Sequence, residues 1–338
     1  MCGIIGYVGR EDALPILREG LSNLEYRGYD SAGVALGGGT LDVYKKEGEL
    51  SALTEILPDS STATMGIGHT RWSTHGEPTD VNAHPHTNES GDVAVVHNGI
   101  IENYATLRDE LEARGHEFTS DTDTEVVPHL VEEELEPERD LVEVVSSVVD
   151  RLEGNYALGV VVAGRDGIVA TRRGNPLVLG FADHGTFLAS DVPAFVEHTR
   201  RVSYPEEGDV IHITEEGATV YVDGEEVSRE VQEVDWDAEA AEKGGYEHYM
   251  LKEIHEQPTA LRQAISGRVD EMKGEVDLEI DLPKEYLNSL EEVQFIACGT
   301  SYHAGLYAAK LFEEHADVRT SVEVASEYEF DGGRDPWR

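Results

Sequence analysis

The sequence predicts an α+β domain built mainly of antiparallel strands, followed by the start of an α/β domain with parallel strands. Up to about residue 225, short apolar runs are separated by Gly, Asn and Pro turns and by several helical patterns, as expected for hairpin-connected strands mixed with helices. Near residue 285 a helical stretch leads into a strand over 293–297, a glycine-containing turn, a helix over 302–315 and a strand over 319–324. This order is typical of a doubly wound fold.

The first domain is predicted to begin with a buried strand over residues 2–8 and a helix over 11–24. The helix is expected because Leu14, Leu17 and Leu21 recur at helical spacing. Further along, strands are predicted over 34–36 and 41–45, a short helix over 50–57, a strand that begins at Met65, and a buried strand over 93–96.

The rest of the first domain alternates helices with short strands. Helices are predicted over 102–114, 124–135 and 140–152, with Asp121-Thr122-Asp123-Thr124 as the cap of the second. Strands are predicted over 156–163, 168–171, 177–179, 186–189 and 209–213, followed by a hairpin around Asp223-Gly224. Residues 228–245 are acidic without a strand pattern, and 246–268 have a helical pattern. The predicted division is a first domain over 1–225, a linker and connecting helix over 226–284, and a second domain over 285–338.

The composition is that of a folded protein with a strongly negative charge. Hydrophobic residues make up 39% of the 338 residues, enough for a packed core, and no apolar run approaches the roughly 18 residues that span a membrane. The N-terminus lacks a secretory signal pattern, which favours the cytoplasm. The net charge of −43 opposes binding to nucleic acid. Because the 69 acidic residues are spread along the chain, they indicate a halophilic surface, with an acidic mesophilic protein as the alternative.

Cys2 is the first candidate catalytic residue. If Met1 is removed, Cys2 carries both a thiol nucleophile and an α-amine, whose ordinary pKa of roughly 7.7–8.0 suits a local base. A nucleophile activated by its own chain terminus is known chemistry, although a small residue at position two also fits simple N-terminal processing. The other cysteine, Cys298, lies in a different context, and two cysteines are too few for a disulfide framework.

Two charged residues of the first domain could bind a charged substrate. Arg71 can hold a carboxylate through two parallel hydrogen bonds, with the neighbouring Trp72 shielding the site from water. The alternative is a structural salt bridge at Arg71. Asp123 could hold an ammonium group, or it could cap the helix at whose start it lies.

Two turns could offer backbone N–H groups to a negative charge. In His97-Asn98-Gly99, the Asn side chain and the glycine N–H could both point at a developing oxyanion, while a plain Asn-Gly turn is the alternative. In Cys298-Gly299-Thr300-Ser301, a glycine and two hydroxyls at a helix start could hold a phosphate. An ordinary strand-to-helix turn with a serine cap is the alternative there.

The histidines of the first domain do not follow a metal-binding spacing. The histidines in question are those of one stretch, His69, His75, His84 and His86. No metal site is therefore expected, and His84-Pro85-His86 is predicted to be a loop that buries its rings and bonds them to neighbours.

Several segments together resemble the class II glutamine amidotransferases, and within that family the branch that forms an amino sugar phosphate. The segments are Cys2-Gly3-Ile4-Ile5-Gly6, Tyr26-Arg27-Gly28-Tyr29-Asp30-Ser31-Ala32-Gly33, His69-Thr70-Arg71-Trp72-Ser73-Thr74-His75-Gly76, Asn82-Ala83-His84-Pro85, His97-Asn98-Gly99-Ile100-Ile101-Glu102-Asn103, Thr122-Asp123-Thr124-Glu125, Glu207-Gly208-Asp209, His248-Tyr249-Met250, Lys252-Glu253-Ile254-His255-Glu256-Gln257-Pro258 and Ala297-Cys298-Gly299-Thr300-Ser301. The resemblance covers nearly the whole chain. It implies an N-terminal-nucleophile hydrolase fold of four layers (αββα) for about residues 2–225, followed by the start of an SIS-type sugar isomerase domain.

The resemblance also implies a role for each candidate residue. Cys2 would attack the side-chain amide of L-glutamine, with its α-amine as proton shuttle, and Asn98 and Gly99 would form the oxyanion hole. The implied glutamine-binding residues are Arg71 for the α-carboxylate, Asp123 for the α-amine, Thr74 and His75 in a closing loop, Trp72 as a shield and Arg27 beside the cysteine. Gly299, Thr300 and Ser301 would hold the phosphate of fructose 6-phosphate, which receives ammonia and becomes glucosamine 6-phosphate. No metal or organic cofactor is implied.

The resemblance further predicts that the chain is truncated at its C-terminus. In the family, a second phosphate loop, a repeated SIS unit and a tail with the isomerisation lysine lie beyond the point that corresponds to Arg338. We therefore expect a glutaminase site without a complete sugar site; the family's homodimer forms largely through the later region. The alternatives are another class II amidotransferase, such as the phosphoribosyl-pyrophosphate type, and an inactive truncated remnant.

Overall fold

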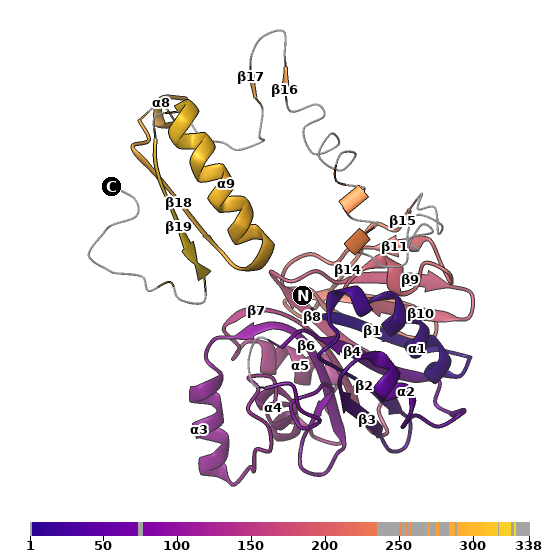
Figure 1. Cartoon of the computed structure of the whole chain (residues 1–338). Helices are drawn as coiled ribbons and strands as arrows, with labels where there is room; N and C mark the ends of the chain where they lie inside the picture. The colour runs from indigo at the N-terminus through magenta and orange to yellow at the C-terminus, as the bar shows by residue number, and fades with distance from the viewer. Residues whose placement is uncertain are drawn as a thin grey trace. The chain divides into compact units, whose positions relative to one another are not determined.

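The chain folds into two compact units, Met1–Ile254 and His255–Arg338, which are described separately. A computed structural model describes residues 2–73, 77–234, 250–251, 254–255, 257, 269–270, 275–276, 284–287, 289–316, 318–325 and 328. Figure 1 shows the helices and strands coloured along the chain. Among these residues, no helix has the length and apolar character needed to cross a membrane.

The first unit is built on two antiparallel sheets. The strands of the larger sheet are β1 (Gly3–Gly9), β2 (Ser31–Gly37), β3 (Asp42–Glu47), β4 (Met65–Arg71), β9 (Val178–Ala182), β10 (Gly185–Ala189), β11 (Arg201–Ser203) and β15 (Gln232–Glu233), in the order β15-β11-β9-β10-β1-β4-β2-β3. Those of the smaller are β5 (His86–Thr87), β6 (Val93–Ile101), β7 (Gly154–Val162), β8 (Ile168–Arg173), β12 (Val210–Thr214), β13 (Gly217–Val222) and β14 (Glu225–Val227), in the order β14-β13-β12-β8-β7-β6-β5.

Helices cover the outer faces of the two sheets (Figure 1). On the larger sheet these are α1 (Ala13–Asn23) and α2 (Leu50–Thr54), with short 3-10 turns at Glu25–Arg27 and Val192–Ala194. On the smaller sheet they are α3 (Tyr104–Arg114), α4 (Val126–Glu134) and α5 (Leu141–Val149). The result is a stack of four layers, helix–sheet–sheet–helix, so the predicted αββα architecture is confirmed.

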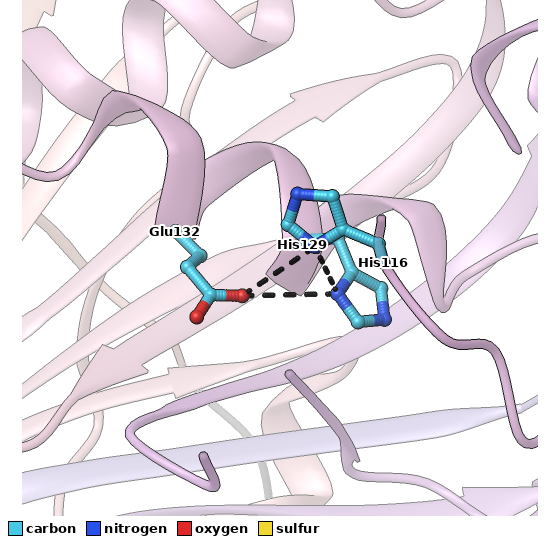
Figure 2. Close-up of side chains that lie close together, drawn as sticks. All are labelled: His116, His129 and Glu132. Atoms are coloured by element: carbon cyan, nitrogen blue, oxygen red, sulfur yellow. Dashed lines mark hydrogen bonds and ion pairs between the residues drawn. The ribbon is translucent and has the colours of Figure 1, made fainter. Parts of the chain in front are cut away.

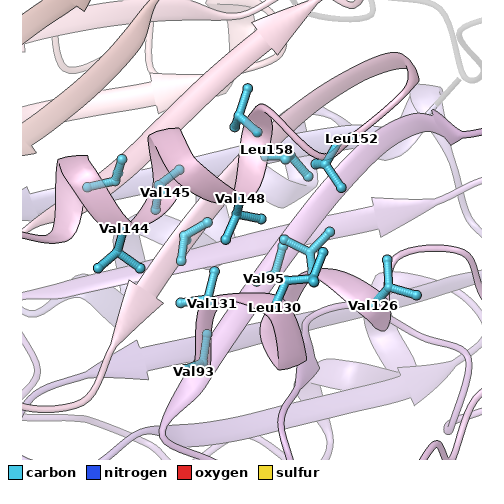
Figure 3. Close-up of a cluster of buried hydrophobic side chains, with 14 of the residues drawn as sticks. Val93, Val95, Val126, Leu130, Val131, Val144, Val145, Val148, Leu152 and Leu158 are labelled. Carbon is cyan, nitrogen blue, oxygen red and sulfur yellow. The ribbon is translucent and has the colours of Figure 1, made fainter. Parts of the chain in front are cut away.

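The alternation of side chains along each strand creates this stack. Successive residues of a strand face opposite sides of its sheet. In β6, Val93 and Val95 pack against the helices, as Figure 3 shows for the cluster around Leu130. The residues between them and after them, Ala94 and Val96, belong instead to the apolar cluster between the two sheets. Burial on both faces explains why Val93–Val96 is an unbroken apolar run, while the polar residues of β4 and β6 gather at the ends of these strands, where the pocket described below lies.

The predicted elements of the first unit are present, with several differences from expectation, among them the unpredicted short strands β5 and β11. The buried strand predicted over 93–96 continues to Ile101, because β7 pairs with it along its whole length. In the predicted linker, Gln232 and Glu233 form a short strand that pairs with Arg201 and Val202. An acidic sequence without an alternating pattern gave no sign of this edge strand.

The second unit contains the predicted strand–helix–strand arrangement. Strand β18 (Glu292–Ala297) leads into helix α9 (Gly299–Ala316), which returns to β19 (Arg319–Val324), and the two strands pair in parallel. A strand pair, β16 (Val269–Asp270) with β17 (Glu275–Val276), and a short helix, α8 (Lys284–Leu287), precede it. Most of the connecting helix predicted over 246–268 lies outside the described residues.

Candidate functional site

One pocket of the first unit brings together five of the predicted site residues, Cys2, Arg71, Trp72, Gly99 and Asp123. Its lining consists of Cys2, Arg71, Trp72, His84, His97, Gly99, Thr122, Asp123 and Thr124. Cys2 stands at the start of β1 and Arg71 at the end of the neighbouring β4, with Gly3 and Thr70 opposite each other in the register. Gly99 comes from β6 of the other sheet, and Asp123 from the loop before α4. The pocket is therefore shared between both sheets.

The thiol of Cys2 is partly buried at the edge of this pocket. The backbone N–H of Trp72 donates a hydrogen bond to Sγ at 3.2 Å. Burial raises the pKa of the Cys2 thiol, while the Trp72 contact and the positive charges of Arg71 and Arg27 act in the opposite direction. Because burial dominates, the resting group is a thiol, and a base must take its proton before it can act as a nucleophile.

The backbone carbonyl of Cys2 is held from two sides. Arg27 Nε donates to it at 3.0 Å and Asn98 Nδ2 at 3.1 Å. The buried Arg27 also pairs with Asp191 at 3.1 Å. These contacts fix the position of Cys2, which directly precedes β1, close to the chain end, where residues are mobile unless they are held.

The side chain of Asn98 is fixed by His69. His69 Nε2 lies 3.0 Å from Asn98 Oδ1 and 3.0 Å from the carbonyl of His97. Since both neighbours are acceptors, Nε2 carries the proton and donates. The Asn98 oxygen is thereby turned toward His69, and its NH₂ group is turned toward Cys2.

Gly99 occupies a position that only glycine fits. Its φ angle is +122°, and a Cβ atom there would lie 2.0 Å from the carbonyl oxygen of Asn155. The close approach of β7 thus requires the missing side chain. It also leaves the Gly99 backbone uncovered where it lines the pocket.

The two charged binding candidates are both buried beside the thiol. Arg71 donates through Nη1 to the Glu77 carbonyl at 3.3 Å, and burial lowers its pKa. Asp123 does not cap α4, so that alternative is wrong. Its Oδ2 accepts from the backbone N–H of Ile101 at 2.8 Å and lies 4.0 Å from His97 Nδ1. The α4 start has Glu125 as its N-cap residue without a side-chain cap bond.

A cluster of buried histidines forms the wall behind the pocket. The rings of His69 and His84 stack with centroids 4.2 Å apart, and the rings of His84 and His86 meet edge-on at 4.6 Å. The backbone N–H of His97 donates to His84 Nδ1 at 3.3 Å. Burial lowers the pKa of each of these rings, that of His69 to about 3, so they are neutral. The prediction that His84 and His86 bury and bond their rings is confirmed.

The sequence interpretation did not include His69, Thr122 or Thr124 among the site residues. His69 faces the space between the sheets because it lies two residues after Ile67 on the same face of β4. The alternation of side chains along β4 could therefore have predicted the position of His69. Thr122 and Thr124 bond to His86 Nε2 at 3.0 Å and His97 Nδ1 at 2.7 Å, which are contacts between distant segments and leave no local pattern.

The remaining predicted residues are not part of this pocket as described. Thr74 and His75 lie outside the described residues. Gly299, Thr300 and Ser301 belong to the second unit, where they form the first turn of α9 and are exposed. Gly299 has a φ angle of +58°.

Comparison with known proteins places this geometry in a family. Residues 69–197 match a model described as glutamine amidotransferase domain. The chain is 59% identical over 337 residues to the glutamine–fructose-6-phosphate aminotransferase (isomerizing) of Halobacterium salinarum, covering 99% of this chain and 56% of that protein. Its identity to a protein of the same name from Thermus thermophilus is 50% over 340 residues, covering 99% and 55%. The chain thus spans about half the length of the curated relatives it matches.

A solved structure supports the fold of the first unit. The glutamine phosphoribosylpyrophosphate amidotransferase of B. subtilis superposes with a TM-score of 0.57 at 27% identity, covering 65% of this chain and 49% of that one. Family model, relatives and structure agree with each other, and the chain belongs to the glutamine amidotransferase family.

Proposed function

We propose that the first unit hydrolyses L-glutamine to glutamate and ammonia. The observation that carries the proposal is the single pocket lined by Cys2, Arg71 and Asp123. A nucleophile, a cation and an anion in one pocket match the amide, the α-carboxylate and the α-amine of glutamine.

The proposed reaction begins with attack of the Cys2 sulfur on the side-chain amide carbon. The C–N bond breaks, the proton taken from the thiol passes to the leaving nitrogen, and ammonia departs from a γ-glutamyl thioester. Water then cleaves the thioester, which releases glutamate and restores the thiol. The base we assign is the α-amine of Cys2 after removal of Met1, because the raised pKa of the thiol calls for a base close by.

We assign the oxyanion of this reaction to Asn98 and Gly99. An amide NH₂ has two hydrogens. Asn98 donates one of them to the Cys2 carbonyl, with Nδ2 3.1 Å from the oxygen, and the other is assigned to the oxyanion. The orientation of the amide by His69 means that no reorganisation is needed during the reaction, which is the property that makes such donors effective. Trp72, Thr74, His75 and Arg27 retain their expected roles around the bound glutamine as part of the same proposal.

The acceptor of the ammonia is a further part of the proposal. The relatives' name indicates fructose 6-phosphate, so we propose that the whole protein, in the cytoplasm, forms glucosamine 6-phosphate. Gly299, Thr300 and Ser301 would contribute to the phosphate site within residues 285–338, after a glutaminase domain over 1–225 and a connecting segment over 226–284. The similarity to these relatives extends over 99% of the chain, which favours this acceptor over the phosphoribosyl-pyrophosphate type. A homodimer of the whole protein belongs to the same proposal.

Release of glutamate and ammonia from glutamine by the purified chain in concentrated KCl tests the glutaminase proposal. We expect activity in the wild type and a loss by a factor of at least about 10³ in Cys2→Ala. The matched control is Cys298→Ala, at the exposed cysteine of the second unit, which should leave the rate unchanged. Activity that survives Cys2→Ala would overturn the mechanism. A folded wild type without any activity would instead favour an inactive remnant.

A further inference from the structure

A second cluster of titratable side chains lies in the helical layer over the smaller sheet. His116 follows Gly115, the C-cap residue of α3, while His129 and Glu132 lie on α4. Residues three apart on a helix share one face, so α4 presents both side chains to His116. Figure 2 shows the three side chains pointing toward one another, and their donor atoms all lie within 4.8 Å.

The spacing of the three donor atoms suits a small metal ion. The Nδ1 atoms of His116 and His129 are 3.1 Å apart. Oε2 of Glu132 lies 3.7 Å from His116 Nδ1 and 3.8 Å from His129 Nδ1. Three atoms with these separations can each lie about 2.1 Å from one common point, which is the length of zinc–nitrogen and zinc–oxygen bonds.

A second carboxylate orients one of the rings for such a role. Glu133 Oε1 lies 3.4 Å from His116 Nε2. A carboxylate beside Nε2 favours the tautomer with its proton there, which leaves the Nδ1 lone pair facing His129. Glu133 is in turn paired with Arg114 and Arg151. A carboxylate behind a histidine ligand is the usual support of a metal site.

The cluster is buried on the side of His129 and open to solvent on the side of Glu132. The His129 side chain is 1% exposed, whereas that of Glu132 is 36% exposed. A solvent-accessible pocket lined by Glu89, Arg114, Gly115, His116 and Glu132 reaches the cluster. A hydrated ion could enter by this side, and a water molecule could remain as the fourth ligand.

We propose that His116, His129 and Glu132 bind one divalent cation of the zinc class. Two imidazoles and one carboxylate suit Zn²⁺, whereas Mg²⁺ and Ca²⁺ prefer oxygen ligands throughout. The bound ion would tie the end of α3 to α4, the helix that follows the Asp123 loop. The role is structural support of that layer. The sequence led us to expect no metal, but that reasoning considered other histidines.

Titration of the untagged, chelator-treated full chain with Zn²⁺ in concentrated KCl tests the proposal. We expect one equivalent to bind with an affinity that competes with a colorimetric chelator, and to raise the melting temperature. His116→Gln should weaken binding at least tenfold and remove the thermal shift. Glu133→Gln, which keeps all three ligands, should weaken it about 10- to 100-fold. His129 is too deeply buried for a clean substitution.

The matched control separates this site from the acidic surface. Glu112→Gln removes an exposed carboxylate that pairs with Arg108 at 3.1 Å on α3, and it should leave stoichiometry and affinity unchanged. A variant with both cysteines replaced by alanine should also keep the site. Equal binding by wild type and His116→Gln would mean that zinc binds adventitiously to surface carboxylates, and it would overturn the proposal. Loss of binding in the cysteine-free variant would overturn it as well.

Discussion

His69 and Asn98 are joined by a hydrogen bond of 3.0 Å between the two sheets of the first unit. The histidine comes from β4 and the asparagine from β6, so the bond crosses the apolar layer that separates the sheets. It determines which end of the asparagine amide faces Cys2. A buried ring that touches no proposed reacting atom therefore controls the direction of a proposed oxyanion donor.

Asn98→Asp should lower kcat for glutamine hydrolysis about 10²- to 10³-fold, because it replaces the NH₂ donor by a carboxylate oxygen near a developing negative charge. KM should change much less, since the proposal assigns the substrate's charged groups to Arg71 and Asp123. Steady-state glutaminase kinetics measure both constants. A kcat within threefold of the wild type would remove Asn98 from the oxyanion hole.

Arg71→Lys should raise KM for glutamine about 10- to 100-fold, with a smaller effect on kcat. Lysine keeps the positive charge but cannot offer two parallel N–H groups to a carboxylate. A glutamine analogue that lacks the α-carboxylate provides the control, because the substitution should hardly affect its hydrolysis. An equal loss with both substrates would indicate that Arg71 is structural.

Gly99→Ala should destabilise the first unit by at least about 2 kcal/mol more than Gly91→Ala does. Both glycines have positive φ angles, +122° and +73°, so both variants carry backbone strain. Only at Gly99 does the added Cβ meet a backbone carbonyl, at 2.0 Å, whereas nothing lies within 4 Å of it at Gly91. Denaturant unfolding measures the difference, and equal effects would contradict the steric argument.

His69 should make the stability of the first unit sensitive to acid. Its pKa is about 3 in the folded protein and about 6.5 in the unfolded chain. Below pH 6.5 the unfolded chain binds a proton that the folded protein does not, so its contribution is complete above pH 6.5 and is lost as the pH falls toward 3. The loss is about 1.4 kcal/mol per pH unit.

Comparison with His69→Gln isolates this contribution from that of the many surface carboxylates. The variant keeps an N–H donor for Asn98 but does not titrate. Free energies of unfolding between pH 7.5 and 4.5 should therefore fall more steeply in the wild type, and the two curves should converge at low pH. Parallel curves would show that His69 is not held neutral.

The sequence was sufficient to predict most helices and strands of this fold, because the apolar patterns that define them are local. Strand β1, helices α1 and α5 and the unit from β18 to β19 all appear where hydrophobic spacing placed them. The pairing of Gln232 with Val202 could not be predicted, since two residues of backbone bonding at a sheet edge require no particular side chains.

The site could be predicted only in part, and for a different reason. Cys2, Arg71, Gly99 and Asp123 were found through motifs of the family, and they line one pocket. The support given by His69, and the bond from Asp123 to the Ile101 backbone in place of a helix cap, depend on which segments meet after folding. The spacing of residues along the chain does not show which distant segments come into contact. The same holds for His116 and His129, which come together across the loop between α3 and α4.

Because both sheets contribute residues to the pocket, the proposed reaction depends on how the two sheets are positioned relative to each other. Cys2 and Arg71 move with one sheet and Asn98 and Gly99 with the other, so any sliding of one sheet over the other would change the distance from the proposed nucleophilic sulfur to the proposed oxyanion donors. A misplacement of about 1 Å can lower a rate 10²-fold. Conservative substitutions in the apolar layer between the sheets, for example at Ile67 or Val96, should then lower kcat even where they hardly change the melting temperature.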